Sequence, residues 1–272
     1  MIPTGFEYER PDSVAAAVSL LERAGDGARP LAGGHSLLPM MKLRLAAPDL
    51  LVDLSGIADL RGIRDAEDHV AVGAMTTHAE VAASDLLAAA CPVVAEAAAG
   101  IGDMQVRNRG TIGGALAHAD AHADMPAVLL ALGGSVIAEG PSGSRQIAAD
   151  DLFLDHMTTA LSADEILTEV RVPKLRSAAY VKFTNRAQDW ATVGAAAAVA
   201  GGRARIALTG VASHAIRAAA AEQAFDGSNL AQAAARAADG LAPPSDTTAS
   251  GEFRAHLATV MVERALRAAI DR

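Results

Sequence analysis

The chain has one cysteine, few aromatic residues and no cluster of positive charge. Cys91 is the only cysteine among 272 residues, which excludes an intrachain disulfide and any four-cysteine zinc or iron-sulfur site within this chain. Aromatic residues make up 3% of the sequence while alanine is abundant, so close helix packing must replace large side chains. A formal net charge of -9 argues against a nucleic-acid partner, because phosphates are bound through clustered lysine and arginine.

Long apolar runs are also absent. The run from Ala191 to Ala200 is far shorter than the roughly 20 residues that cross a bilayer, so we expect no transmembrane segment. The first ten residues include Glu7, Glu9 and Arg10, and no apolar region follows them as an export signal requires. We therefore expect a cytoplasmic protein. The 51% apolar content predicts a compact chain, long enough for two domains.

Apolar spacing and turn residues predict alternating helices and strands. Pro11, Asp12 and Ser13 place a capping residue before a helix through Leu21, and Thr77 with Glu80 should form a capping box. Further predicted helices cover Leu37 to Leu45, much of Asp85 to Ala99, Ala127 to Leu132 with Asp124 as its cap, His214 to Phe225, Leu230 to Ala238 and Glu252 to Ile270. After a turn at Gly25 to Pro30, the predicted strands are Leu31 to Ala32, Leu50 to Leu54, a hairpin of Gly62 to Arg64 with His69 to Val72, Ser135 to Ala138, Ile166 to Val172, Tyr180 to Phe183, Ala195 to Ala200 and Arg205 to Val211.

Two glycine pairs indicate a phosphate-bearing ligand. Gly33-Gly34 and Gly113-Gly114 could let backbone N–H groups converge on a pyrophosphate at a helix start. A glycine pair is more often an ordinary turn. The chain also lacks a complete GxGxxG fingerprint, a GxxxxGK loop and an HExxH helix. Residue spacing is therefore compatible with a phosphate-bearing ligand and does not name it.

The sequence around both pairs resembles the flavin-binding signatures of the medium subunits of aerobic carbon monoxide dehydrogenases. The first signature is Arg29 to Leu45, and the second is Gly110 to Gly114 with Ala119-Asp120, Ala123-Asp124 and Pro126-Ala127. The similarity runs from Met1-Ile2-Pro3 to Glu252-Phe253-Arg254. It implies an α+β fold: a two-lobed FAD-binding domain of the vanillyl-alcohol-oxidase/PCMH type over residues 1–175, with lobes at about 1–56 and 57–175, and a small α+β C-terminal domain over 176–272.

The resemblance also implies the cofactor, FAD, and the residues that contact it. Two segments would wrap the pyrophosphate: Ala32, Gly33, Gly34, His35, Ser36 and Leu37 on one side, and Thr111, Ile112, Gly113, Gly114 and Ala115 on the other. Asp124, Leu161 and Lys182 match further flavin-contacting positions, although helix capping for Asp124 and a surface location for Lys182 are the ordinary alternatives. Trp190 matches an aromatic position beside the flavin ring in some relatives, with a core or interface role equally open.

No catalytic residue and no metal site are assigned. His35, His78, His118 and His122 do not form a ligand set, and Cys91, followed by Pro92, is interpreted as a small buried hydrophobe. Ala115 replaces the asparagine, aspartate or serine that is usual after Gly114 in relatives, which removes one side-chain hydrogen bond.

The resemblance implies an electron-transfer subunit of a molybdenum hydroxylase. A molybdopterin-binding large subunit would oxidise the substrate, a 2Fe-2S small subunit would carry the electrons, and FAD here would pass them to an external acceptor. The complex would be a dimer of heterotrimers in the cytoplasm or, through its partners, at the inner face of the membrane. Two alternatives stay open: a self-sufficient flavoprotein oxidase, and a scaffold that has lost FAD. The substrate, whether carbon monoxide, a purine, an aldehyde or an N-heterocycle, cannot be read from this subunit.

Overall fold

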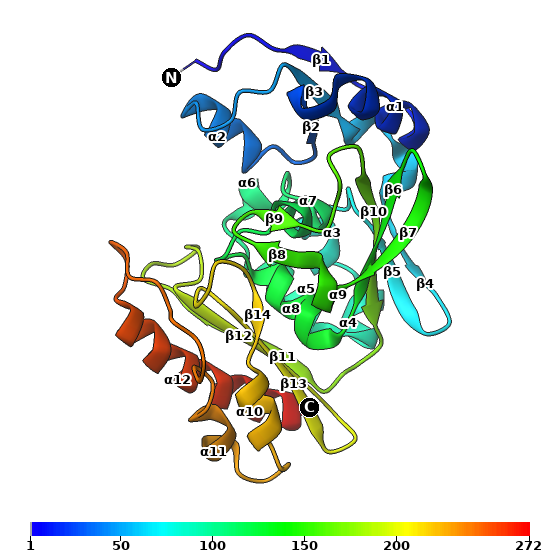
Figure 1. The fold of residues 1–272 in the computed structure, drawn as a ribbon. Coiled ribbons are helices and arrows are strands. Elements are labelled where there is room, and N and C mark those ends of the chain that lie inside the picture. Colours follow the sequence, from blue (N-terminus) through cyan, green and yellow to red (C-terminus); the bar gives the residue numbers. More distant parts are fainter. Residues whose placement is uncertain (1) are drawn as a thin grey trace.

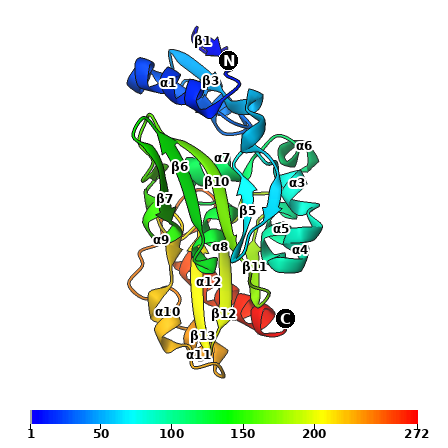
Figure 2. The same ribbon diagram turned by 90° about the vertical axis from the view of Figure 1, so that its right-hand side faces the viewer.

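The computed structural model describes residues 2–272, so only Met1 of the resemblance lies outside it. The chain forms three parts that follow one another along the molecule (Figures 1 and 2). The first, here the N-terminal lobe, has a parallel sheet in the order β1-β3-β2 with helix α1 against it. Its elements are β1 (Glu7–Glu9), α1 (Val14–Ala24), η1 (Gly25–Gly27), β2 (Ala28–Leu31), α2 (Leu37–Lys42), β3 (Leu50–Asp53), η2 (Leu54–Gly56) and η3 (Ala58–Leu60).

The second part, the middle lobe, is a five-stranded sheet in the order β4-β5-β10-β6-β7, with helices on one face. Every neighbouring pair of its strands is antiparallel. Figure 2 shows α3, α4 and α5 beside one another at this sheet. The elements are β4 (Ile63–Asp65), β5 (His69–Gly73), α3 (His78–Ala82), α4 (Asp85–Ala90), α5 (Pro92–Ala99), α6 (Met104–Arg107), α7 (Ile112–His118), α8 (Asp124–Leu132), β6 (Ser135–Gly140), β7 (Gly143–Ala148), α9 (Ala149–Leu152), β8 (Phe153–Asp155), β9 (Thr158–Thr159) and β10 (Ile166–Pro173).

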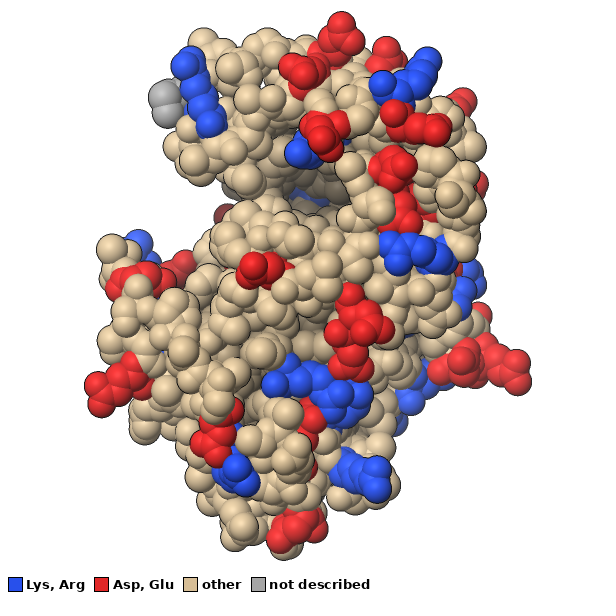
Figure 3. Space-filling model, in the orientation of Figure 1, with Lys and Arg blue, Asp and Glu red and all other residues tan. Residues whose placement is uncertain are grey.

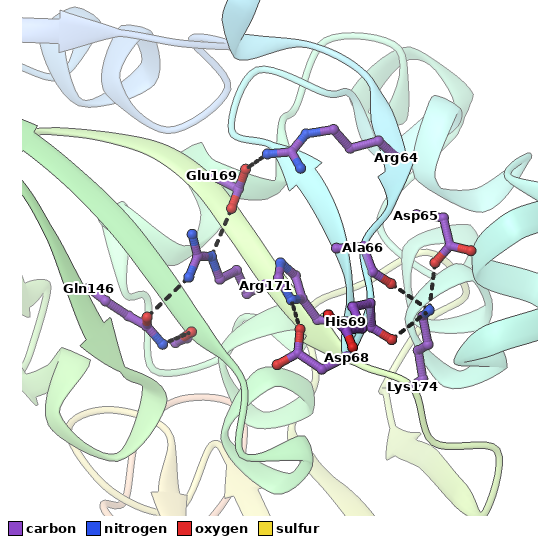
Figure 4. Close-up of polar contacts among 11 residues, drawn as sticks. Arg64, Asp65, Ala66, Asp68, His69, Gln146, Glu169, Arg171 and Lys174 are labelled. Carbon is purple, nitrogen blue, oxygen red and sulfur yellow. Dashed lines mark hydrogen bonds and ion pairs between the residues drawn. The ribbon is translucent and has the colours of Figure 1, made fainter.

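The two faces of the middle sheet differ in polarity. Val72, Val136 and Val170 are buried on the helix-covered face. Figure 4 shows the opposite face, where Glu169 of β10 joins Arg64 of β4 and Arg171 of its own strand. Such pairs between partly exposed side chains contribute little stability each. The alternation of apolar and polar residues along the strands therefore selects the helix-covered face as the core.

The third part, the C-terminal part, packs an antiparallel sheet between helices α8 and α12. The sheet order is β11-β12-β13-β14. On the central strand, Ala196 and Ala198 join the core of the middle lobe while Ala195 and Ala197 join the core beneath α12. Methyl side chains on both faces let a helix approach each side closely. The elements are β11 (Ala178–Phe183), β12 (Val193–Ala200), β13 (Arg203–Thr209), β14 (Ile216–Arg217), α10 (Ala219–Ala224), α11 (Leu230–Ala234) and α12 (Gly251–Ile270).

Most predicted elements are present, and the errors have local causes. The predicted turn at Gly25 to Pro30 is wrong in part, because β2 begins at Ala28 through pairing with β3. The helix predicted over Asp85 to Ala99 is two helices, since Pro92 begins a new one. The helix predicted from His214 begins only at Ala219, after the short strand β14. Helices α2 and α11 end earlier than predicted, and β1, η1, η2, η3, α6, α7, β7, α9, β8 and β9 were not predicted.

Within residues 2–272, no helix combines the length and the apolar character that crossing a bilayer requires.

Candidate functional site

A cavity of about 790 Å³ lies between the N-terminal lobe and the rest of the molecule. It is visible as the deep hollow below the N-terminal lobe in Figure 3. Its size is within the range of cofactor and ligand sites. The lining comes from all three parts of the chain: most residues from 28 to 37 in and after β2, residues of α3, α7 and α8, most residues from 159 to 167 before and in β10, and Lys182 with residues 188–190 of the C-terminal part.

Residues Gly33 to Ser36, which connect β2 to α2, line the cavity, and their backbone N–H groups are not used within the described part of the chain. Within residues 2–272, none of these four N–H groups donates a hydrogen bond to another backbone group. Gly34 has a φ of +77°, a left-handed conformation that favours glycine. The hydroxyl of Ser36 makes no capping bond to α2. Successive free N–H groups in such a turn form a concave site for an anion.

The second glycine segment differs, because its N–H groups are already used within the protein. The N–H groups of Ile112 and Gly113 donate to the carbonyls of Thr76 and Ala74, at 3.0 and 2.9 Å. That of Gly114 donates to the Thr111 hydroxyl at 3.1 Å, which caps α7. This segment is therefore a cavity wall rather than a second set of converging donors. Ile112 points into the core and does not line the cavity.

Gly33 and Gly113 permit close backbone contacts. Neither residue has a positive φ, so the reason for glycine is space. A Cβ on Gly33 would lie 2.1 Å from the carbonyl oxygen of Arg109, and a Cβ on Gly113 would lie 2.5 Å from the Cβ of Ala74. Gly33 thus brings the first segment directly against the chain that leads into the second.

A buried polar cluster forms another wall of the cavity. The Asp124 carboxylate accepts hydrogen bonds from the Tyr180 hydroxyl at 2.6 Å and from Lys182 Nζ at 2.7 Å. Lys182 also donates to the carbonyl of Gly100 at 3.0 Å. Burial raises the pKa of Asp124, and Lys182 and Tyr180 act in the opposite direction. Burial, and then the charge of Asp124, raises the pKa of Tyr180.

Two simple interpretations of this cluster are wrong. The N-cap of α8 is Ala123, and Asp124 is the first helical residue, with its carboxylate turned to Lys182 and Tyr180 instead of capping the helix. Lys182 is not a surface lysine, because only 17% of its side chain is exposed.

All of the other residues expected at the site line this cavity: Ala32, Gly33, Gly34, His35, Ser36, Leu37, Thr111, Gly113, Gly114, Ala115, Asp124, Leu161 and Lys182. Trp190 lines it too, with 59% of its surface exposed. Sequence reasoning did not place further lining residues there, among them His78, Ile101, Gly102, Ser162, Leu167 and Gln188. The one sequence signal that bears on His78 is the capping box at Thr77. It predicts that His78 is the first residue of α3.

Neither His78, which lines the cavity, nor the buried Cys91 changes its charge near pH 7. Burial lowers the pKa of His78 to about 4, which keeps its ring neutral at pH 7. Cys91 is buried, as predicted, and burial raises its pKa to about 11. In the described part of the chain, no group of three or more His, Cys, Asp or Glu side chains is placed to hold a metal ion.

Comparison with known proteins identifies both parts of the sequence. The family described as FAD binding domain in molybdopterin dehydrogenase matches residues 4–175, and the CO dehydrogenase flavoprotein C-terminal domain matches residues 178–269. The chain is 43% identical to the carbon monoxide dehydrogenase medium chain of Hydrogenophaga pseudoflava, over 99% of this chain and 98% of that protein. It is 41% identical to the 6-hydroxypseudooxynicotine dehydrogenase complex subunit alpha of Paenarthrobacter nicotinovorans, over 100% of this chain and 97% of that protein.

The fold agrees with these sequence matches. A solved structure of carbon monoxide dehydrogenase from Hydrogenophaga pseudoflava, which lacks the Mo-pyranopterin moiety of the molybdenum cofactor, superposes with a TM-score of 0.96 and 44% identity, covering 100% of this chain and 99% of that one. Fold and cavity therefore define a flavoprotein component of an oxidoreductase, with an FAD-binding domain followed by a C-terminal domain and with FAD as its cofactor. The chain belongs to the family of FAD-binding medium subunits of the molybdenum hydroxylases, the family of carbon monoxide dehydrogenase medium chains.

Proposed function

We propose that this chain holds FAD in the cavity, with the pyrophosphate at Gly33 to Ser36, and passes electrons from the iron-sulfur clusters of a partner subunit to an external acceptor. The observation that carries this proposal is the set of four unused N–H groups at the cavity wall. They suit a ligand that is anionic at one point along its length. Bound FAD supplies the redox chemistry, and the protein binds and orients it.

The remaining walls suit the other parts of such a ligand. The Ser36 hydroxyl lies beside the N–H groups and can donate a further hydrogen bond to a phosphate oxygen. Leu161 and Leu167 supply apolar surface. Lys182 and Asp124, on another wall, offer a charged donor and a charged acceptor to polar ligand groups. In this arrangement the residues bind and orient the cofactor, and none has to act as a nucleophile.

We propose two partners for the chain, a molybdopterin-binding large subunit and a 2Fe-2S small subunit, assembled as a dimer of heterotrimers. The names of the relatives support a multi-subunit complex, since one is a medium chain and another a subunit of a dehydrogenase complex. These relatives act on different substrates, so substrate choice belongs to a partner. We also propose domains at residues 1–175, with lobes at about 1–56 and 57–175, and at 176–272; the family matches at 4–175 and 178–269 support the main division.

A reconstitution experiment tests this division of labour. The chain alone, loaded with FAD under anaerobic conditions, should be reduced by an artificial donor and not by carbon monoxide, purines or aldehydes. Adding the large and small subunits should restore substrate-driven bleaching of the oxidised flavin band. Substrate-driven bleaching by the chain alone, at the rate of the complex, would contradict the proposal and support a self-sufficient oxidase.

A further inference from the structure

Arg254, in the first turn of α12, is a fully buried cation far along the sequence from the cavity residues. Its Nη1 donates to the carbonyl oxygens of Thr192 and Gly210, at 2.6 and 3.1 Å. Its Nη2 forms an ion pair with Asp246 at 2.6 Å. One guanidinium thus holds two backbone segments and one carboxylate, in an environment where an unpaired charge is costly.

Both of these backbone segments lead to the cavity. Thr192 closes the loop between β11 and β12, because its N–H donates to the carbonyl of Phe183 at 2.8 Å. This loop carries Gln188, Asp189 and Trp190, which line the cavity. Holding the Thr192 carbonyl therefore fixes the end of the loop two residues from Trp190.

The segment at Gly210 leads to the cavity wall that carries Asp124. The Gly210 N–H donates to the carbonyl of Ala121 at 2.7 Å, and the Thr209 hydroxyl donates to the carbonyls of Ala121 and Ala123, at 2.6 and 3.0 Å. Asp124 of the cavity wall follows directly in sequence. The contact with the Trp190 loop is also direct, because His122 Nδ1 lies 2.8 Å from the carbonyl oxygen of Ala191.

The groups that surround Arg254 are closely packed and held in place by other bonds. A Cβ on Gly210 would lie 2.3 Å from the Thr192 carbonyl oxygen, so the two carbonyl groups converge on the cation only because residue 210 is glycine. Asp246 is itself held by the N–H groups of Thr248 and Ala249, at 2.7 and 3.0 Å. These bonds and Arg254 lower the pKa of Asp246 to about 2. The ion pair is therefore formed at any physiological pH.

We propose that Arg254, anchored by Asp246, is a positioning residue that holds the Trp190 loop at the mouth of the cavity. Trp190 then forms a fixed edge of the opening, and its position determines how far solvent and an electron acceptor reach the bound ligand. This inference rests on the proposed function, because it takes the cavity as the site of the flavin.

Trp190 is the only tryptophan of the chain, so fluorescence excited at a wavelength that the two tyrosines do not absorb reports this residue alone. We would compare Arg254→Met, Arg254→Lys and Asp246→Asn with the wild type by acrylamide quenching, by fluorescence anisotropy and by FAD titration. The Met variant should show stronger acrylamide quenching, lower anisotropy and about tenfold weaker FAD binding, which corresponds to the loss of roughly one strong hydrogen bond. The Lys and Asn variants, which keep part of the network, should lie between.

Two controls separate positioning from general destabilisation. Arg236→Met removes an exposed ion pair with Asp239 and should change none of the three measurements. Leu266→Ala opens the core on the same helix without touching the Arg254 network, so it should lower the Tm and leave Trp190 unchanged below the transition. Equal changes in Leu266→Ala, or wild-type behaviour in all three network variants, would overturn the proposal.

Each remaining result also has a defined meaning. If Arg254→Met does not fold, Asp246→Asn decides, because it changes only the partly exposed partner of the pair and leaves the bonds from Arg254 to the carbonyls of Thr192 and Gly210 in place. If FAD fails to quench Trp190 in the wild type, the proposed location of the flavin is wrong. Acrylamide quenching and anisotropy would then still decide whether Arg254 holds the loop.

Discussion

The substitution Gly33→Ala tests the close contact between the two glycine segments. The added methyl group would lie 2.1 Å from the Arg109 carbonyl oxygen, whereas real Cβ contacts are essentially never closer than 3.0 Å. The first segment must therefore move by about 1 Å away from the backbone of Arg109 and Gly110. Strain of this kind costs about 1–3 kcal/mol in a packed region.

We expect a lower melting temperature, by roughly 2–4 °C for each kcal/mol lost in a chain of this size. Because the displaced segment carries the four unused N–H groups, flavin affinity should also fall, by about tenfold for each 1.4 kcal/mol of lost binding energy. Thermal unfolding and flavin absorbance after gel filtration measure the two effects separately.

A matched control is Gly56→Ala, whose methyl group would lie 2.6 Å from the Pro11 carbonyl oxygen in the same lobe but outside the cavity lining. It should lower stability and leave flavin occupancy near the wild-type value. Gly33→Ala with a wild-type melting temperature and full flavin content would refute the argument. The contact between the segments would then not define the site.

Three further predictions follow from the site. Lys182→Met should destabilise the protein by about 3 kcal/mol at neutral pH, because it leaves Asp124 buried without its cation. The folded-state pKa of Asp124 is already raised, so the stability linked to it is present at low pH and lost as pH rises through that pKa. Urea unfolding of the variant should therefore show a deficit that grows as the pH rises above about 4, the ordinary pKa of an aspartate, and Asp124→Asn should relieve it. The flavin released from the protein should be FAD by mass spectrometry, and FMN alone would contradict the pyrophosphate assignment. Cys91 should resist iodoacetamide in the native protein at pH 8 and react fully when unfolded, because its pKa is about 11 and it is buried.

The sequence predicted those elements that begin at a local signal, such as a helix-capping residue, or that have a long regular apolar pattern. Ser13 and Thr77 cap helices where the sequence indicated, and the long helix α12 spans nearly the predicted range. The edge strand β7 was missed because its residues Gly143–Ala148 are largely exposed and lack an apolar alternation. The strand β14 was missed because its two residues are strand only through pairing with β13.

The sequence predicted which residues line the site, but it did not predict what each of them contacts there. Both glycine pairs suggested converging N–H donors, yet those at Ile112 to Gly114 are used by Thr76, Ala74 and Thr111. This depends on β5 and the following turn packing against α7, which no local pattern reveals. The partnership of Asp124 with Tyr180 and Lys182 joins residues more than fifty positions apart and equally requires the fold.

The alanine-rich strand β12 has a consequence for recombination between related subunits. One face of this strand belongs to the core of the middle lobe, through Ala196 and Ala198, and the other to the core under α12. An exchange of residues 176–272 for those of a relative would therefore cut through a shared interior and not through a linker. A larger side chain at either alanine would press on α8, which belongs to the other parent. Functional chimeras of these subunits should accordingly need α8 and β12 from the same parent, although the two lie in different matched segments of the chain.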